Sequence, residues 1–225
     1  MQSRFNYRQS YMTMLILVVL FGVFIFETLN GGSENTATLL KMGAMNNLAV
    51  AQGQWWRLFA AQFLHIGIMH IASNAVMVLY MGQYIEPLIG HFRFLIIYLL
   101  SGIGGNLLSF ALGNDNNLSA GASTALFGLF GAMIAIGLAN RNYPAISFLS
   151  RQAFALAFIN LALDIFMPSI DILGHLGGLI AGYLLTVIIG SNKLRNYNTM
   201  WRIAALVILV IYTLWTMRTG MVITN

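Results

Sequence analysis

The side chains best suited to chemistry in this sequence are a serine and a histidine, each near the start of an apolar segment. Ser123 lies in the stretch Gly121–Gly131, which is apolar apart from the hydroxyls of Ser123 and Thr124 and is punctuated by glycines. His175 stands near the start of another apolar segment. A serine at a helix N-terminus lies beside unpaired backbone N–H groups and the positive end of the helix dipole, which favour developing negative charge. The pair would suit acyl transfer, in which the histidine takes the serine proton and returns it to the leaving group.

Each of these residues taken alone also suits a purely structural role. Ser123 would cap its helix or pack against a neighbour, because short Gly-x-Ser patterns occur often by chance. His175 would form a hydrogen bond to a neighbouring helix. The catalytic interpretation therefore depends on the rest of the chain.

The composition is that of a polytopic, all-α membrane protein. Of the 225 residues, 59% are hydrophobic and 8% are charged, and the mean hydropathy is +0.78. A soluble domain carries about 25% charged residues. The absence of cysteine excludes disulfides and thiolate metal sites. The net charge of +5 is better explained by basic cytoplasmic loops than by nucleic-acid binding.

Seven apolar segments are predicted to cross the membrane, since each is close to the about 17–25 residues required. They run approximately over residues 11–26, 64–84, 94–112, 120–138, 152–167, 172–190 and 203–217. The polar connection 30–54 is expected to be partly helical and to lie at the membrane interface, followed by the aromatic anchor Trp55-Trp56-Arg57. We find no linker that would divide the chain, so residues 1–225 are predicted to form one domain.

The distribution of Lys and Arg predicts a cytoplasmic N-terminus and an external C-terminus. In that orientation eight basic residues are cytoplasmic: Arg4, Arg8, Arg93, Arg141, Arg151, Lys193, Arg195 and Arg202. Only Lys41, Arg57 and Arg218 fall outside, in agreement with the positive-inside rule. The segments with Ser123 and His175 then both begin at the outer face. Glu27 and Glu86 are expected at the membrane interface.

The second segment carries three polar side chains, each of which needs a reason inside a membrane. His70 and Asn74 are four residues apart and therefore share one helix face. They would either bond neighbouring helices or, as neutral donors, hold an oxyanion. His65 lies about 140° around the helix from His70. Because the sequence also lacks an HExxH motif and a carboxylate cluster, we predict no metal and no cofactor.

Small residues are placed to bring the fourth and sixth segments close together. His175, Gly178 and Gly182 form one stripe, and the two glycines allow another helix to approach closely. Glycines of the fourth segment offer the same to a partner. Such packing would bring Ser123 within hydrogen-bond reach of His175, and Phe127, one turn after the serine, would stack on the imidazole.

Taken in order, four motifs on successive segments resemble those of the rhomboid family of intramembrane serine proteases. They are Trp56-Arg57, His65…His70-x-x-x-Asn74, Gly121-x-Ser123 and His175-x-x-Gly178-x-x-x-Gly182. The resemblance covers the first through the sixth segment. It implies a six-helix bundle, here a core at about 11–190, with an added seventh helix at about 203–217.

The resemblance also implies roles for individual residues. Ser123 would be the nucleophile and His175 the general base and acid, while His70 and Asn74 would donate to the oxyanion beside the Ser123 backbone N–H. The loop with Trp56 and Arg57 would lie sideways in the outer leaflet as structural support. The implied function is an endopeptidase of a bacterial plasma membrane. Its partners would be single-span membrane proteins, cleaved near the outer face, and the lipid bilayer, with no nucleic acid.

One residue departs from the family pattern, which usually has glycine where this sequence has Thr124. Its β-branched side chain would either obstruct the substrate or bond back to a carbonyl of the first helical turn, and we expect the second. The alternative is an inactive rhomboid-like protein that binds transmembrane clients without cleaving them.

Two acids bear on the remaining alternatives. A transporter would need polar groups through the bundle, and Asp164, the only acid deep enough to count, lies near the outer end of its segment. Asp171, four residues before His175, is predicted to cap the sixth helix rather than to orient the histidine.

Overall fold

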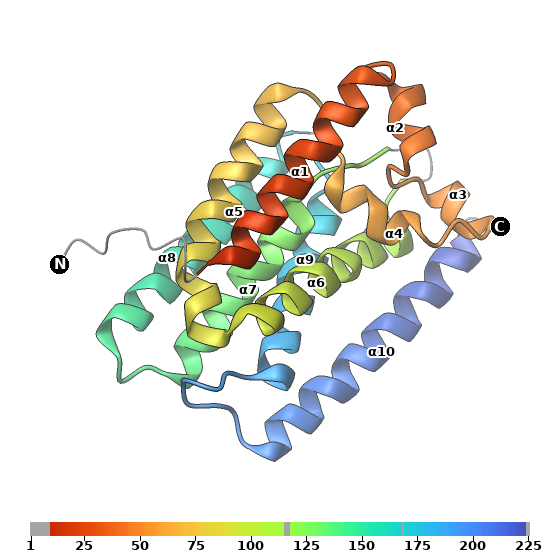
Figure 1. Cartoon of the computed structure of the whole chain (residues 1–225). Helices are drawn as coiled ribbons and strands as arrows, with labels where there is room; N and C mark the ends of the chain where they lie inside the picture. The colour runs from red at the N-terminus through yellow and green to blue at the C-terminus, as the bar shows by residue number, and fades with distance from the viewer. Residues whose placement is uncertain (1–9, 115–117, 168, 224–225) are drawn as a thin grey trace.

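The computed structural model describes residues 10–114, 118–167 and 169–223, which form an all-helical bundle (Figure 1). The longer helices are α1 (Tyr11–Leu29), α5 (Ile68–Ile89), α6 (His91–Leu112), α7 (Ser123–Ala139), α8 (Pro144–Asp164), α9 (Ile172–Ile189) and α10 (Thr199–Ile223). The connection from α1 to α5 contains α2 (Thr36–Met42), α3 (Asn47–Ala51), α4 (Arg57–Ala60) and the 3₁₀ helix η2 (Ala61–Phe63). Arg4, Arg8 and residues 115–117 lie outside the described residues.

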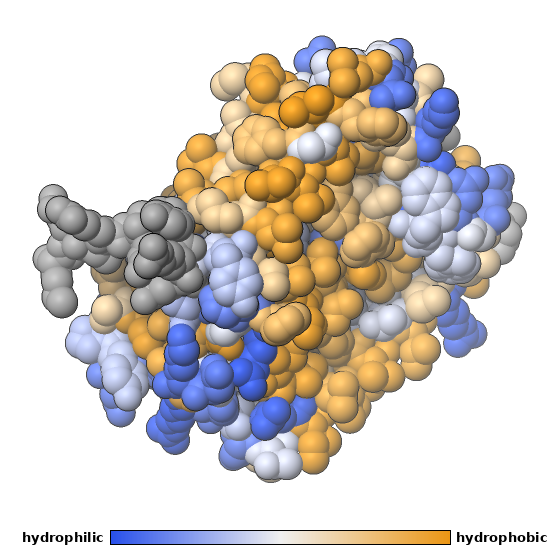
Figure 2. Space-filling view, viewed as in Figure 1, coloured by the Kyte–Doolittle hydropathy of each residue, from blue (hydrophilic) through white to orange (hydrophobic). Residues whose placement is uncertain are grey.

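The helices have the lengths and apolar surfaces of a membrane protein. Five of them, α1, α6, α8, α9 and α10, are long and apolar enough to cross a bilayer. The segment Arg57–Phe63 and α5 pass the same criterion as a pair bent by 93°, and α7 is a shorter apolar helix. In Figure 2, hydrophobic side chains cover the visible face between two polar ends. The all-α membrane fold is thereby confirmed, while the count of seven spans stays a prediction.

Three predicted helix starts differ from the structure by four residues or more, and two of them have a local cause. The second long helix begins at Ile68 rather than at residue 64, because Gly67 takes the left-handed φ of +79° and interrupts the chain there. Helix α8 begins at Pro144 rather than at residue 152. Proline suits the first helical position, where its missing N–H would have no intrahelical partner. The last helix is also longer than predicted and spans Thr199–Ile223.

Helix α7 is the central element and packs most closely against α9. A β-carbon on Gly182 of α9 would overlap the backbone of Gly128 of α7, and one on Gly178 would overlap the Thr124 carbonyl. The two backbones therefore touch without intervening side chains, as small residues in membrane helices permit. This contact fixes the position of the α9 N-terminus, which carries His175, against that of α7.

We expect Gly182→Ala to destabilise the bundle by about 1–3 kcal/mol, the usual cost of overpacking a close contact. The added methyl would meet backbone atoms of Gly128, which cannot rotate away. The measurement is the thermal midpoint of the detergent-solubilised protein. Gly22→Ala is the matched control, because this exposed helical glycine of α1 has no atom within 4 Å of the added carbon. Equal midpoints for the two variants would contradict the packing argument.

Helix α10 packs along α6 and α9 (Figure 1). The Tyr212 hydroxyl donates a hydrogen bond of 2.6 Å to the carbonyl of Gly104 in α6. The same hydroxyl would lie 2.7 Å from a β-carbon on Gly177 of α9. The added C-terminal helix thus braces the two helices that support the His175 region.

Two carboxylates for which a position at the membrane interface is expected are buried within the protein. The residues Glu27 and Glu86 are each 0% exposed. Glu86 accepts hydrogen bonds from the Thr13 backbone N–H at 2.8 Å and hydroxyl at 2.6 Å, and pairs with His91 Nδ1 at 2.5 Å. Glu27 accepts the His65 backbone N–H at 3.2 Å. Glu86 thereby satisfies N–H groups at the start of α1, which have no partner within the helix. Glu27 satisfies an N–H of the connection between η2 and α5.

Three connections that carry basic residues meet at one end of the bundle. The Lys193 ammonium, between α9 and α10, donates to the carbonyl of Pro87 near the α5–α6 turn at 2.8 Å. The Arg195 backbone N–H donates to Asn140 Oδ1, between α7 and α8, at 3.0 Å. These are the loops predicted to be cytoplasmic, and the N-termini of α7 and α9 lie at the opposite end.

Candidate active site

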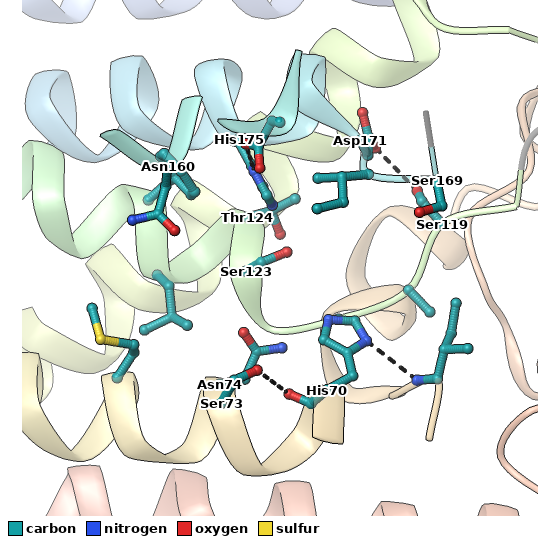
Figure 3. A pocket seen from close by; sticks show the side chains of 18 of the residues that line it. His70, Ser73, Asn74, Ser119, Ser123, Thr124, Asn160, Ser169, Asp171 and His175 are labelled. Carbon is teal, nitrogen blue, oxygen red and sulfur yellow. Dashed lines mark hydrogen bonds and ion pairs between the residues drawn. The ribbon is translucent and has the colours of Figure 1, made fainter. Parts of the chain in front are cut away.

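A cavity of about 530 Å³ lies at the end of the bundle where α7 and α9 begin (Figure 3). Its lining includes the four residues predicted to do chemistry: Ser123, His175, His70 and Asn74. These come from three helices, α7, α9 and α5. In the view of Figure 3, Ser123 lies between His175 on one side and Asn74 and His70 on the other. The predicted set is therefore brought to one site.

Ser123 is the first residue of α7, immediately after a turn that requires glycine. Gly121 has a φ of +142°, a conformation that L side chains rarely adopt. A β-carbon at this position would also lie 2.8 Å from His70 Nε2. The Gly121 backbone N–H donates to the Ala61 carbonyl at 3.0 Å, which ties the turn to the η2 segment. The chain before Ser123 can thus pass directly over His70.

The His175 imidazole is held by contacts from two other helices. Its Nδ1 lies 2.6 Å from Asp164 Oδ2 at the end of α8. Its ring stacks on Phe127 of α7, with the centroids 4.2 Å apart and the planes 15° apart, as expected from the sequence. Because Nδ1 is engaged by Asp164, Nε2 is the ring nitrogen that remains available for chemistry in the cavity that His175 shares with Ser123.

His70 and Asn74 present two N–H donors to the same cavity. The Ile66 backbone N–H donates to His70 Nδ1 at 3.3 Å. Since Nδ1 must accept this bond, a neutral ring carries its proton on Nε2. Asn74 Nδ2 is buried and has no hydrogen-bond partner within the described part of the chain. A buried donor without a partner is unusual and calls for an explanation, such as an acceptor that is present only during the reaction.

The sequence of this chain matches those of known proteins. A family model for the Rhomboid domain matches residues 52–192. The chain belongs to the rhomboid family. It is 37% identical over 196 residues to Rhomboid protease GluP of Bacillus subtilis (strain 168), covering 87% of this chain and 38% of that protein. It is 41% identical over 154 residues to RHOMBOID-like protein 1 of Arabidopsis thaliana, covering 67% and 39%.

Membership of the rhomboid family indicates the general class of this protein. Rhomboids are intramembrane serine proteases and their inactive relatives, so this chain is a multi-pass integral membrane protein of that family. The chain spans less than half the length of the two relatives named above. Activity and substrates are therefore matters for proposal.

Asp171 caps the rhomboid's α9, as predicted. Its Oδ1 accepts the Gly174 backbone N–H at 2.8 Å, and its Oδ2 accepts the Ser119 hydroxyl at 3.1 Å. The acid that contacts His175 is Asp164, and the sequence motifs did not predict this contact. The sequence does contain a signal for this contact, because Asp164 and His175 are 11 residues apart, on either side of one short connection between two helices.

Thr124 corrects one expectation about the rhomboid site. Its Oγ1 is buried and has no hydrogen-bond partner among the described residues, so the expected bond to a carbonyl of the first turn is absent. A β-carbon on Gly105 would lie 2.9 Å from Thr124 Cβ, and one on Gly174 would lie 3.0 Å from Thr124 Cγ2. The side chain is 5% exposed. Two glycines of α6 and α9, rather than a hydrogen bond, accommodate its bulk.

We therefore expect Thr124→Gly to change the cleavage rate by less than about tenfold, or roughly 1.4 kcal/mol of barrier. The buried side chain packs against helix backbones, so its removal leaves the mouth of the site largely unchanged. Thr124→Val is the matched variant, because it keeps the shape and removes only the unpaired hydroxyl. If the wild-type protein does not cleave and the Thr124→Gly variant does, the wild-type protein would instead belong to the inactive class.

Arg57 and Trp56 lie in the connection before α5, outside the group that lines the described cavity. The Arg57 guanidinium donates to Gln54 Oε1 at 2.7 Å and to the carbonyls of Leu40 and Ala44 at 2.8 Å each. It also lies 5.0 Å from the ring centroid of Trp56. These bonds hold the short helices α2 to α4 together.

Proposed function

We propose that this rhomboid is an intramembrane serine endopeptidase that uses Ser123 as nucleophile and His175 as general base and acid. The observation that carries the proposal is the state of the imidazole. Its Nδ1 is hydrogen-bonded to a carboxylate and its ring is stacked on Phe127, which leaves Nε2 without a hydrogen-bond partner among the described residues, in a cavity that Ser123 at the start of α7 also lines. A nucleophile and a base held in a fixed orientation are the parts that acyl transfer requires.

The reaction proceeds in two halves. His175 Nε2 takes the Ser123 Oγ proton as Oγ attacks the scissile carbonyl carbon, and the carbonyl electron pair moves to oxygen. The tetrahedral intermediate collapses, the C–N bond breaks, and His175 returns the proton to the leaving nitrogen. Water then attacks the acyl-serine with His175 again as base, which releases the acid product and restores the Ser123 hydroxyl.

The negative oxygen of the tetrahedral intermediate needs donors placed in advance. His70 Nε2–H, Asn74 Nδ2–H and the Ser123 backbone N–H are the candidates in this cavity. The α7 dipole adds to them, because its positive end faces the same point. Such donors act most strongly where water is scarce.

The proposed substrates are single-span membrane proteins, cut near the outer membrane face. An intact substrate helix keeps its scissile carbonyl hydrogen-bonded, so the cut segment must unwind, which glycine or proline makes less costly. The basic loops at the opposite end support an orientation with the N-terminus in the cytoplasm, and the proposed location is a bacterial plasma membrane. In this scheme Trp56 and Arg57 brace the outer loop, while Gly121, Gly178 and Gly182 allow the close approaches described above.

The test is labelling of purified protein in detergent by a fluorophosphonate, together with mass spectrometry of products from a single-span model substrate. Wild type is expected to be labelled on Ser123 and to yield two fragments, and Ser123→Ala is expected to do neither. A wild-type protein that is neither labelled nor active, yet retains a transmembrane client in pull-down, would establish the inactive binding function instead.

A further inference from the structure

Asp164 occupies a place that the stability of its own helix does not explain. It is the last residue of α8 and is 7% exposed. A carboxylate at a helix C-terminus faces the negative end of the helix dipole, which is unfavourable. A buried charge in a membrane protein is costly and needs a partner. The partner that the structure provides is His175.

The contact between them is short and well defined. Asp164 Oδ2 lies 2.6 Å from His175 Nδ1, and both side chains are largely shielded from solvent. A hydrogen bond between an ionised carboxylate and a ring N–H is stronger and shorter than a neutral one. Within the described residues, this side-chain hydrogen bond also connects α8 to α9. The connection runs from the end of one helix to the first turns of the next.

We propose that Asp164 is a positioning residue that completes a Ser-His-Asp arrangement with Ser123 and His175, an inference that rests on the proposed function. By accepting a hydrogen bond from Nδ1–H, the carboxylate keeps the ring proton on Nδ1. The lone pair is then on Nε2, where it can take the Ser123 proton. When Nε2 is protonated, the carboxylate stabilises the resulting imidazolium without itself taking a proton.

A purely structural bond between α8 and α9 is the competing explanation, and kinetics separates the two. Loss of a structural bond would lower stability or alter the cavity, so thermal stability or KM would change. Loss of a positioning residue would lower kcat, because base strength and tautomer matter only once substrate is bound. Phe127 still stacks on the ring in either case. The decrease in kcat should therefore be smaller than the decrease of about 10⁴-fold in a soluble Ser-His-Asp protease whose aspartate is replaced by asparagine.

The experiment measures kcat and KM on a single-span model substrate, the rate of fluorophosphonate labelling and the thermal midpoint. Asp164→Asn removes the charge with little change in shape. Asp171→Asn is the matched control, since asparagine also caps helices and Asp171 bonds Gly174 and Ser119 rather than His175. Asp164→Glu restores the charge.

We expect Asp164→Asn to lower kcat and the labelling rate at least tenfold, with KM within about twofold and the midpoint close to wild type. Asp171→Asn should retain kcat, and Asp164→Glu should recover part of it. The proposal is overturned if Asp164→Asn keeps wild-type kcat, if Asp171→Asn loses as much, or if folded Asp164→Glu is no better than Asp164→Asn. A wild-type protein that neither cleaves nor is labelled would instead refute the proposed function itself.

Discussion

Replacing either Ser123 or His175 by alanine is expected to abolish cleavage of a single-span substrate while leaving the bundle folded. A nucleophile and its base act as one unit, so the loss of either costs about as much as the loss of both, on the order of 10⁶-fold in a soluble serine protease. The double variant should therefore be no slower than either single variant. The measurement is product formation in detergent, with substrate in excess.

Controls for this prediction come from the same cavity. Ser73→Ala removes another cavity-lining hydroxyl, which bonds the His70 carbonyl at 2.9 Å, and should retain most of the activity. The thermal midpoint shows whether the His175→Ala variant is still folded, because this substitution leaves Phe127 without its stacking partner. If either folded single variant kept more than a small fraction of wild-type cleavage, the assigned pair would be wrong.

Replacing His70 or Asn74 by alanine is expected to lower kcat by roughly 10²–10³, the usual effect of losing one oxyanion donor. KM should change little, because the oxyanion exists only in the transition state. The structure supplies the physical reason, since His70 Nε2 bears a proton that its Nδ1 contact assigns and Asn74 Nδ2 is buried without a partner in the described chain.

Asn160→Ala is the matched control for the Asn74 variant. Asn160 also lines the cavity, but its Nδ2 already donates to the Leu156 carbonyl of its own helix at 2.7 Å. Its removal should cost far less than removal of Asn74. Unchanged kcat in both His70→Ala and Asn74→Ala would return these two residues to a structural role.

The sequence by itself determined the membrane class, the family and the approximate position of each long helix. The membrane class and the helix positions follow from local patterns, namely apolar length and the spacing of small residues, whereas the family follows from the resemblance of four motifs. The same patterns placed Ser123 and His175 at the starts of two helices and predicted that Phe127 would stack on the imidazole. The spacing of residues along the sequence is enough to predict these features.

Only the tertiary structure decided which acid meets His175 and what surrounds Glu27, Glu86 and Thr124. Asp164 contacts His175 because α8 ends beside the start of α9, and no periodicity within either helix reveals that approach. The hydrogen bonds that Glu27 and Glu86 accept from N–H groups of distant segments are likewise seen only in the folded chain. Thr124 lacks the expected hydrogen bond and is instead accommodated by glycines of two other helices. Each of these depends on contacts between segments far apart in the sequence, whose mutual distances are set only when the whole bundle packs.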